Sequence, residues 1–125
     1  MKYILAFLVL VALGASASAQ HAHGVQKGPN GGQMEDVAGV HAELLTSANT
    51  ITVNVFDEGG KPVNAGGYTG SALVVSGSNR ETVTLAPSAS NVLKGQAKGP
   101  IASGAVITLL IKTDAGKTGQ ARFKG

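Results

Sequence analysis

Short stretches in which apolar and polar residues alternate follow one another from residue 33 to the end of the chain. The clearest stretch, residues 50–57, would place three aliphatic side chains on one side of a strand: Ile51, Val53 and Val55. A similar stripe over residues 40–44 precedes it, and the turn residues 47–49 between the two predict an antiparallel hairpin. A period of two residues is typical of β-strands that bury one face.

Further strands are expected wherever this alternation recurs between turn residues. They cover residues 68–76, 80–85, 91–98 and 105–112, and a last strand carries Ala121 and Phe123. No amphipathic helix is expected after residue 19. The regular spacing of short strands and turns predicts an all-β, antiparallel β-sandwich, immunoglobulin-like or cupredoxin-like, with a small barrel as the alternative.

The first 19 residues follow a different pattern. Lys2 precedes an apolar run from Ile4 to Leu13, and small residues ending in Ala-Ser-Ala follow at 17–19. A positive start, a short apolar run and a small-residue end indicate a secretory signal peptide. The run is shorter than the roughly 20 residues that a membrane span needs. Cleavage is therefore expected before Gln20, and the mature protein is expected to be periplasmic or secreted.

The remaining chain divides into an arm and a domain. Residues 20–32 are polar and rich in His and Gly, with no periodicity, and are expected to form a flexible arm. Residues 33–125 are expected to form the β-sandwich. The formal charge of +3 falls to +2 once Lys2 is removed with the signal peptide.

The composition excludes several classes of protein. The chain has no Cys, which rules out a disulfide scaffold, a Cys-based zinc site and a haem attachment motif. Aromatic residues make up only 4%, too few for a nucleic-acid binder that stacks bases. Arg80, Arg122 and the lysines form no run along the sequence, so neither a phosphate patch nor a membrane patch is expected. No second apolar stretch approaches the length of a membrane span, so no stable membrane insertion is expected after cleavage.

An enzyme is not expected, and a small secreted enzyme ranks last among the alternatives. The chain has neither a Cys nucleophile nor a G-x-S-x-G elbow. The carboxylate pairs at 35–36 and 57–58 are adjacent in sequence, so in a strand they would point to opposite faces. No organic cofactor is expected.

Metal binding is the chemistry to which the residues point. Three histidines lie near the front of the chain, His21, His23 and His41, and imidazole suits copper, zinc and nickel. His41 and Glu43 would project from one face of a strand, and Met34 could supply a thioether to Cu(I). After cleavage His21 would be second and His23 fourth, whereas a tight amino-terminal chelate commonly uses a third-position His. The competing interpretation is that all three histidines are exposed residues without a metal.

Two segments carry a resemblance to known proteins. The turn Gly28-Pro29-Asn30-Gly31-Gly32, with Gln33-Met34 and the later His41–Leu44 strand, is similar to the His-rich lead of periplasmic adaptor subunits of heavy-metal efflux pumps. Residues 55–63, with the pattern D-x-x-G-K-P-V, resemble small exported immunoglobulin-like domains of the YtkA-like group. The resemblance covers residues 21–63. The chain has no helical hairpin and no room for lipoyl or barrel domains, so it would be a free-standing relative of one domain.

The resemblance implies a periplasmic protein that binds or hands on copper or zinc, with metal-efflux or other envelope proteins as partners. His21, His23 and His41 would inherit the metal-binding role, and Met34 and Glu43 are weaker candidates. The alternative function is a structural or interaction β-sandwich of the cell envelope that binds no metal.

Overall fold

The computed structural model describes residues 26–124, and these contain nine β-strands and no helix. The strands are β1 (Gln26–Lys27), β2 (Gln33–Val37), β3 (Val40–Ser47), β4 (Thr50–Phe56), β5 (Thr69–Ser76), β6 (Asn79–Pro87), β7 (Val92–Gln96), β8 (Val106–Lys112) and β9 (Thr118–Lys124). Between residues 26 and 124, no helix is long and apolar enough to cross a membrane. The expected signal peptide, His21 and His23 lie outside the described residues.

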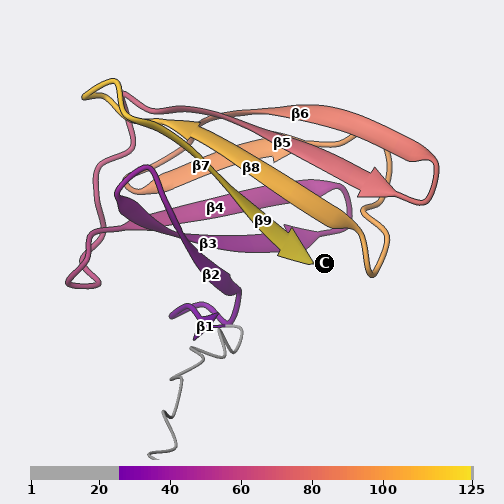
Figure 1. Ribbon diagram of the computed structural model, residues 1–125, viewed down its shortest axis with the longest axis horizontal. Helices are drawn as coiled ribbons and strands as arrows, with labels where there is room; N and C mark the ends of the chain where they lie inside the picture. Colours follow the sequence, from indigo (N-terminus) through magenta and orange to yellow (C-terminus); the bar gives the residue numbers. More distant parts are fainter. Residues whose placement is uncertain (1–25, 125) are drawn as a thin grey trace, which may run out of the picture.

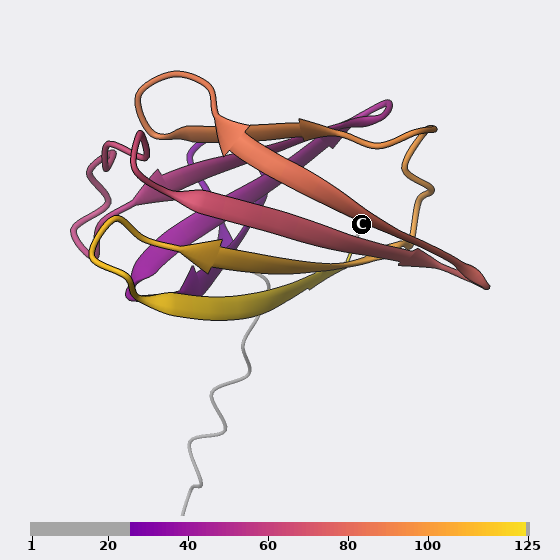
Figure 2. The same ribbon diagram turned by 90° about the horizontal axis from the view of Figure 1, so that it is seen from above.

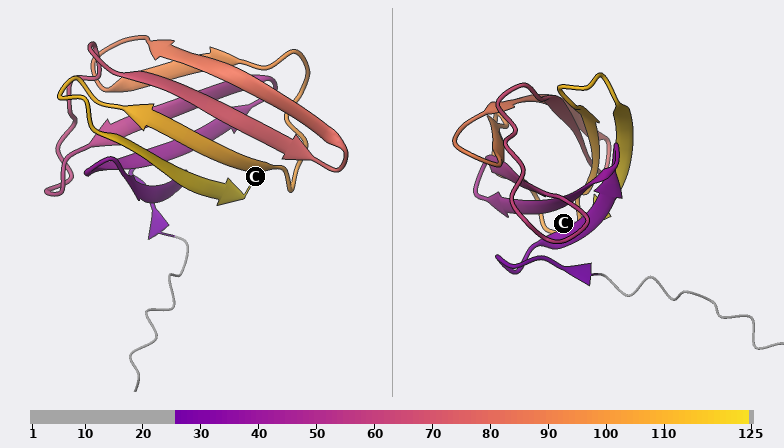
Figure 3. Two further views of the ribbon diagram at one scale, coloured as in Figure 1. Left: turned by 45° about the horizontal axis from the view of Figure 1, so that its top comes forward. Right: turned by 90° about the vertical axis from the view of Figure 1, so that its left-hand side faces the viewer.

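The strands form one antiparallel sheet in the order β1-β2-β3-β4-β7-β6-β5-β8-β9. Figure 1 shows the sheet folded over on itself, with β2, β3 and β4 below and β5, β6 and β8 above. Seen end on, it curls into a half-barrel (Figure 3, right). At the seam the Gln33 side chain hydrogen-bonds the backbone N–H and C=O of Lys124. The all-β, antiparallel, sandwich-like fold expected from the sequence is confirmed.

The core lies between the two layers and follows the expected alternation. The hairpin predicted around residues 47–49 is confirmed, since β3 and β4 pair antiparallel along their lengths. Tyr68 adds an aromatic side chain to this core. The side chains that are fully or almost fully buried on the inner face are aliphatic apart from Phe123: Ile51, Val53, Val55, Val83, Leu85, Leu93, Ile107, Leu109 and Ile111. Burial of these aliphatic faces is the main stabilising contribution to the fold.

The structure differs from the expected flexible arm in its last seven residues. Gln26 and Lys27 form β1 and pair with Met34 and Gln33 of β2. The turn that follows, residues 28–32, packs on the outer face of β3, as described below. The ordered domain therefore begins before residue 33.

Candidate functional site

The register of β2, β3 and β4 places most of the predicted site residues on one outer face of the sheet. Met34, Glu43 and Asn54 lie side by side in one row across the three strands. Asp36 and His41 form the neighbouring row. The prediction that His41 and Glu43 share one face is confirmed, because inner-face residues separate them along β3. This outer surface is hereafter the β2–β4 face.

Glu43 is fully buried although it points away from the core. The turn 28–32 covers it and supplies three donors. Asn30 donates its backbone N–H to Oε2 at 2.8 Å and its side-chain Nδ2 to Oε1 at 2.8 Å. The backbone N–H of Gly32 reaches Oε2 at 3.0 Å, and Nδ2 of Asn54 reaches Oε1 at 3.3 Å. We call Glu43, Asn54 and the turn 28–32 the Glu43 clasp.

The sequence of the turn explains why it can close over the carboxylate. Gly28 accepts a backbone hydrogen bond from Gly31 and donates one to Gly32, which draws the loop tight. Gly31 has a φ of +83°, a backbone conformation that residues other than glycine rarely adopt. A Cβ on Gly28 would collide with the Glu43 side chain, and one on Gly32 would lie 2.9 Å from Cγ of Glu43. The glycines therefore make room for the buried carboxylate.

Hydrogen bonding keeps Glu43 ionised despite its burial. Burial by itself opposes the charged form and would raise the pKa of the carboxyl group. The bonds from Asn30, Gly32 and Asn54 outweigh that effect, so the pKa of Glu43 lies below its ordinary value. Both carboxylate oxygens are already engaged by nitrogen donors, and the arrangement anchors the turn on the sheet.

His41 lies at the open end of the same face. Its Nδ1 contacts a carboxylate oxygen of Asp36 on the neighbouring strand. The His41 side chain is 26% exposed and that of Asp36 is 81% exposed. Both line a cavity of about 430 Å³ that also includes Glu58. The pair leaves Nε2 as the ring nitrogen of His41 that can bind a metal.

The described residues do not complete a metal site by themselves. Within residues 26–124 there is no group of three or more His, Asp or Glu side chains that could hold a metal ion. Met34 pairs with Glu43 rather than with His41, so the structure does not bring its thioether into the His41 row. His41 with Asp36 is the part of the predicted set that the structure brings together in an accessible place.

The turn resembling D-x-x-G-K-P-V has a structural role here. Asp57 accepts the backbone N–H of Lys61 on Oδ1 at 2.9 Å, and its carbonyl accepts the N–H of Gly60 at 3.0 Å. Pro62 then forms an isolated bridge to Phe56. These bonds fold the loop back over the end of β4, next to the His41 cavity that Glu58 lines.

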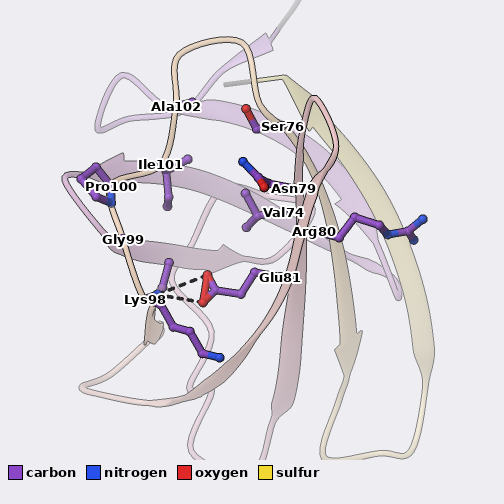
Figure 4. A pocket seen from close by; sticks show the side chains of 11 residues that line it. Val74, Ser76, Asn79, Arg80, Glu81, Lys98, Gly99, Pro100, Ile101 and Ala102 are labelled. Atoms are coloured by element: carbon purple, nitrogen blue, oxygen red, sulfur yellow. Dashed lines mark hydrogen bonds between the residues drawn. The ribbon is translucent and has the colours of Figure 1, made fainter.

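A second cavity of about 430 Å³ opens at the far end of the molecule, where β6 and the chain after β7 separate. Figure 4 shows Val74 and Ile101 facing each other across it, while Arg80 points away. Glu81 spans the gap and accepts the backbone N–H of Lys98 at 2.8 and 3.2 Å. None of the predicted site residues lines this cavity. Glu81 links β6 to the segment that follows β7.

Two members of the clasp were missed by reasoning from the sequence. Residues 28–32 were expected to belong to the flexible arm, and neither Asn30 nor Asn54 was proposed as a site residue. Asn30 lies 13 residues before Glu43, and only the fold brings them together. A carboxylate between Ala42 and Leu44 was the available signal that Glu43 needs polar partners.

No family model, curated protein or solved structure matches this chain. The function is therefore argued from the chemistry of its own residues.

Proposed function

We propose that the protein is an exported, non-enzymatic, transition-metal-binding accessory protein of metal resistance or efflux. It would bind copper or zinc through His41 together with His21 and His23. The signal-like sequence of residues 1–19 supports export. The observation that carries the metal proposal is the His41–Asp36 pair. A metal-bound histidine almost always donates its other ring N–H to a carboxylate or carbonyl, which fixes the ring and leaves the second nitrogen for the metal.

The place where the described chain begins supports the participation of His23. β1 pairs antiparallel with β2, with Lys27 opposite Gln33 and Gln26 opposite Met34. His23 precedes Gln26 by three residues, a span of at most about 11 Å. Asp36 is two strand residues beyond Met34, about 7 Å, so His23 is within reach of the His41 pair.

The test is a calorimetric titration of the exported protein with Cu(II), Cu(I) and Zn(II). A saturable site with a Kd below about 10 μM is expected for one of them. The combined His21→Ala, His23→Ala and His41→Ala variant is expected to lose that site. Asp36→Asn is expected to weaken it by about 10-fold to 100-fold, since it removes the partner of the imidazole. Asp114→Asn, an exposed carboxylate in the β8–β9 turn, is the matched control.

Two results would contradict the proposal. Absence of a saturable site for all three ions would leave the alternative, a structural or interaction domain without metal. Unchanged affinity in the triple variant would show that other residues hold the ion.

A further inference from the structure

The outer surface of the other half of the molecule has an unusual distribution of charge. β6, β5, β8 and β9 lie side by side in one layer (Figure 2 and Figure 3, left). Their registers place the outward side chains in rows. One row reads Arg80, Val75, Val106, Lys124, and the next reads Thr82, Leu73, Thr108, Arg122. A third row carries Leu110, and Lys112 follows it on β8.

Most of the cationic side chains of this surface stand on different strands from the apolar ones. The two middle strands, β5 and β8, carry four aliphatic residues that are partly or largely exposed: Leu73, Val75, Val106 and Leu110. Leu110 is 48% exposed, and no other large hydrophobic residue among residues 26–124 is classed as exposed. The flanking strands β6 and β9 carry Arg80, Arg122 and Lys124, all exposed. We call the surface formed by these aliphatic and cationic residues, together with Lys112, the cationic face.

No Asp or Glu belongs to this face. All seven acidic residues of the chain lie within residues 26–124, and none is in these rows. Glu81 is on β6, but it pairs with the buried Val74 and so points to the other side of the sheet. Four of the ten Lys and Arg residues are therefore gathered around an aliphatic centre, with no Asp or Glu side chain in the same rows.

We propose that the cationic face docks reversibly on an anionic lipid bilayer. Each Lys or Arg near such a surface contributes favourably, and clusters of four or more are typical of peripheral lipid binding. The sheet is convex here (Figure 3, right), so the aliphatic residues of β5 and β8 form its crest. Arg80, Arg122 and Lys124 stand on the flanking strands, from which their long side chains can reach the headgroups beside the crest. Leu110 and the hollow of about 270 Å³ beside it would meet the interface.

The composition of the face favours a bilayer over a protein partner. Tight protein interfaces depend on central Trp, Tyr and Arg anchors. The rows of this face contain no aromatic residue, and its arginines are at the flanks rather than at the centre. A planar anionic surface requires charge and exposed aliphatic side chains but no shaped pocket, which matches what the face offers.

Sedimentation with vesicles tests the proposal. The exported protein is mixed with phosphatidylcholine vesicles that contain either none or roughly 40% phosphatidylglycerol. Binding is expected only to the anionic vesicles, and it should fall at least about tenfold when salt rises from about 0.05 M to about 0.5 M. Binding that is equal on neutral vesicles, or absent from both, would overturn the proposal.

Two matched triple variants locate the contact. Arg80→Gln, Arg122→Gln and Lys124→Gln together are expected to lower the partition coefficient about 100-fold, at about fivefold per cation. Lys27→Gln, Lys61→Gln and Lys94→Gln remove the same charge from exposed positions elsewhere and are expected to change it much less. Equal losses would indicate general attraction to net charge and overturn the assignment of the face.

Leu110→Ser tests the apolar crest. It is expected to weaken vesicle binding about fivefold while the salt dependence stays the same. If sedimentation velocity instead shows a dimer that Leu110→Ser dissociates, the face is an interface between two copies and the lipid proposal is wrong. Both measurements are independent of metal, so their failure would leave the proposed metal site untouched.

Discussion

Glu43 and His41 are two residues apart on the same face of the same strand, yet their surroundings are opposite. Glu43 is sealed by the 28–32 turn and receives four hydrogen bonds. His41 has one carboxylate partner and remains open to a cavity. A polar side chain whose hydrogen-bonding capacity is filled by its own fold contributes to stability. One that is held by a single partner keeps a free atom for a ligand.

The largest effect expected from this comparison is on folding stability at Glu43. Glu43→Gln removes the charge and turns an amide N–H₂ toward donors, so the free energy of unfolding should fall by about 3 kcal/mol. Urea denaturation measures this. Glu81→Gln, the same change at a carboxylate that also accepts a backbone N–H but is less buried, should cost less than about 1 kcal/mol. Similar losses at both positions would contradict the special role of the clasp.

A smaller effect is expected from crowding the clasp. Gly28→Ala places a methyl group against the Glu43 side chain and should lower the free energy of unfolding by about 2 kcal/mol. Gly99→Ala is the control, because a Cβ there meets no atom within 4 Å. Hydrogen exchange at the amide of Gly32 should accelerate in Gly28→Ala and not in Gly99→Ala. If the two variants were equally stable, the turn would be looser than the structure indicates.

The lowered pKa of Glu43 predicts a more modest dependence of stability on pH. Because the carboxyl group has a lower pKa in the folded protein than in the unfolded chain, ionisation stabilises the fold. That contribution is complete above the ordinary value of 4.5 and is lost as pH falls through the folded pKa. The urea midpoint of the wild type should therefore decline on acidification below about pH 5. Glu43→Gln should decline less, and parallel curves would exclude Glu43 as the source.

The smallest effect on stability is expected at His41. The Asp36 carboxylate that His41 contacts is largely exposed, and contacts of this kind contribute little, so His41→Gln should change the free energy of unfolding by less than about 0.5 kcal/mol. The same variant should nevertheless weaken metal binding measured by calorimetry. Gly28→Ala should instead lower the free energy of unfolding more than it weakens metal binding. A large loss of stability in His41→Gln would place this residue with the clasp and remove the contrast.

The outer face that carries the cations shows which structural features follow from the sequence pattern and which depend on strand pairing. Within the expected strand over residues 80–85, Val83 and Leu85 are buried and Thr82 and Thr84 are exposed, as a two-residue period requires. Arg122 and Lys124 alternate in the same way with the buried Phe123, but Arg80 is some 40 residues away along the chain. Only the pairing of β6 with β5, β5 with β8 and β8 with β9 places them on one face.

The sequence alone determined most of the strands, the central hairpin and the shared face of His41 and Glu43, because a two-residue period and local turn residues encode them. It did not determine β1, the strand order, the partners of Glu43 or where the ordered domain begins. Asn30 meets Glu43 because the turn folds back across β3, and that contact depends on glycines that leave space rather than on any periodic pattern. Contacts between distant segments are decided by register and by room in three dimensions, so the tertiary structure alone could separate the sealed carboxylate from the open histidine.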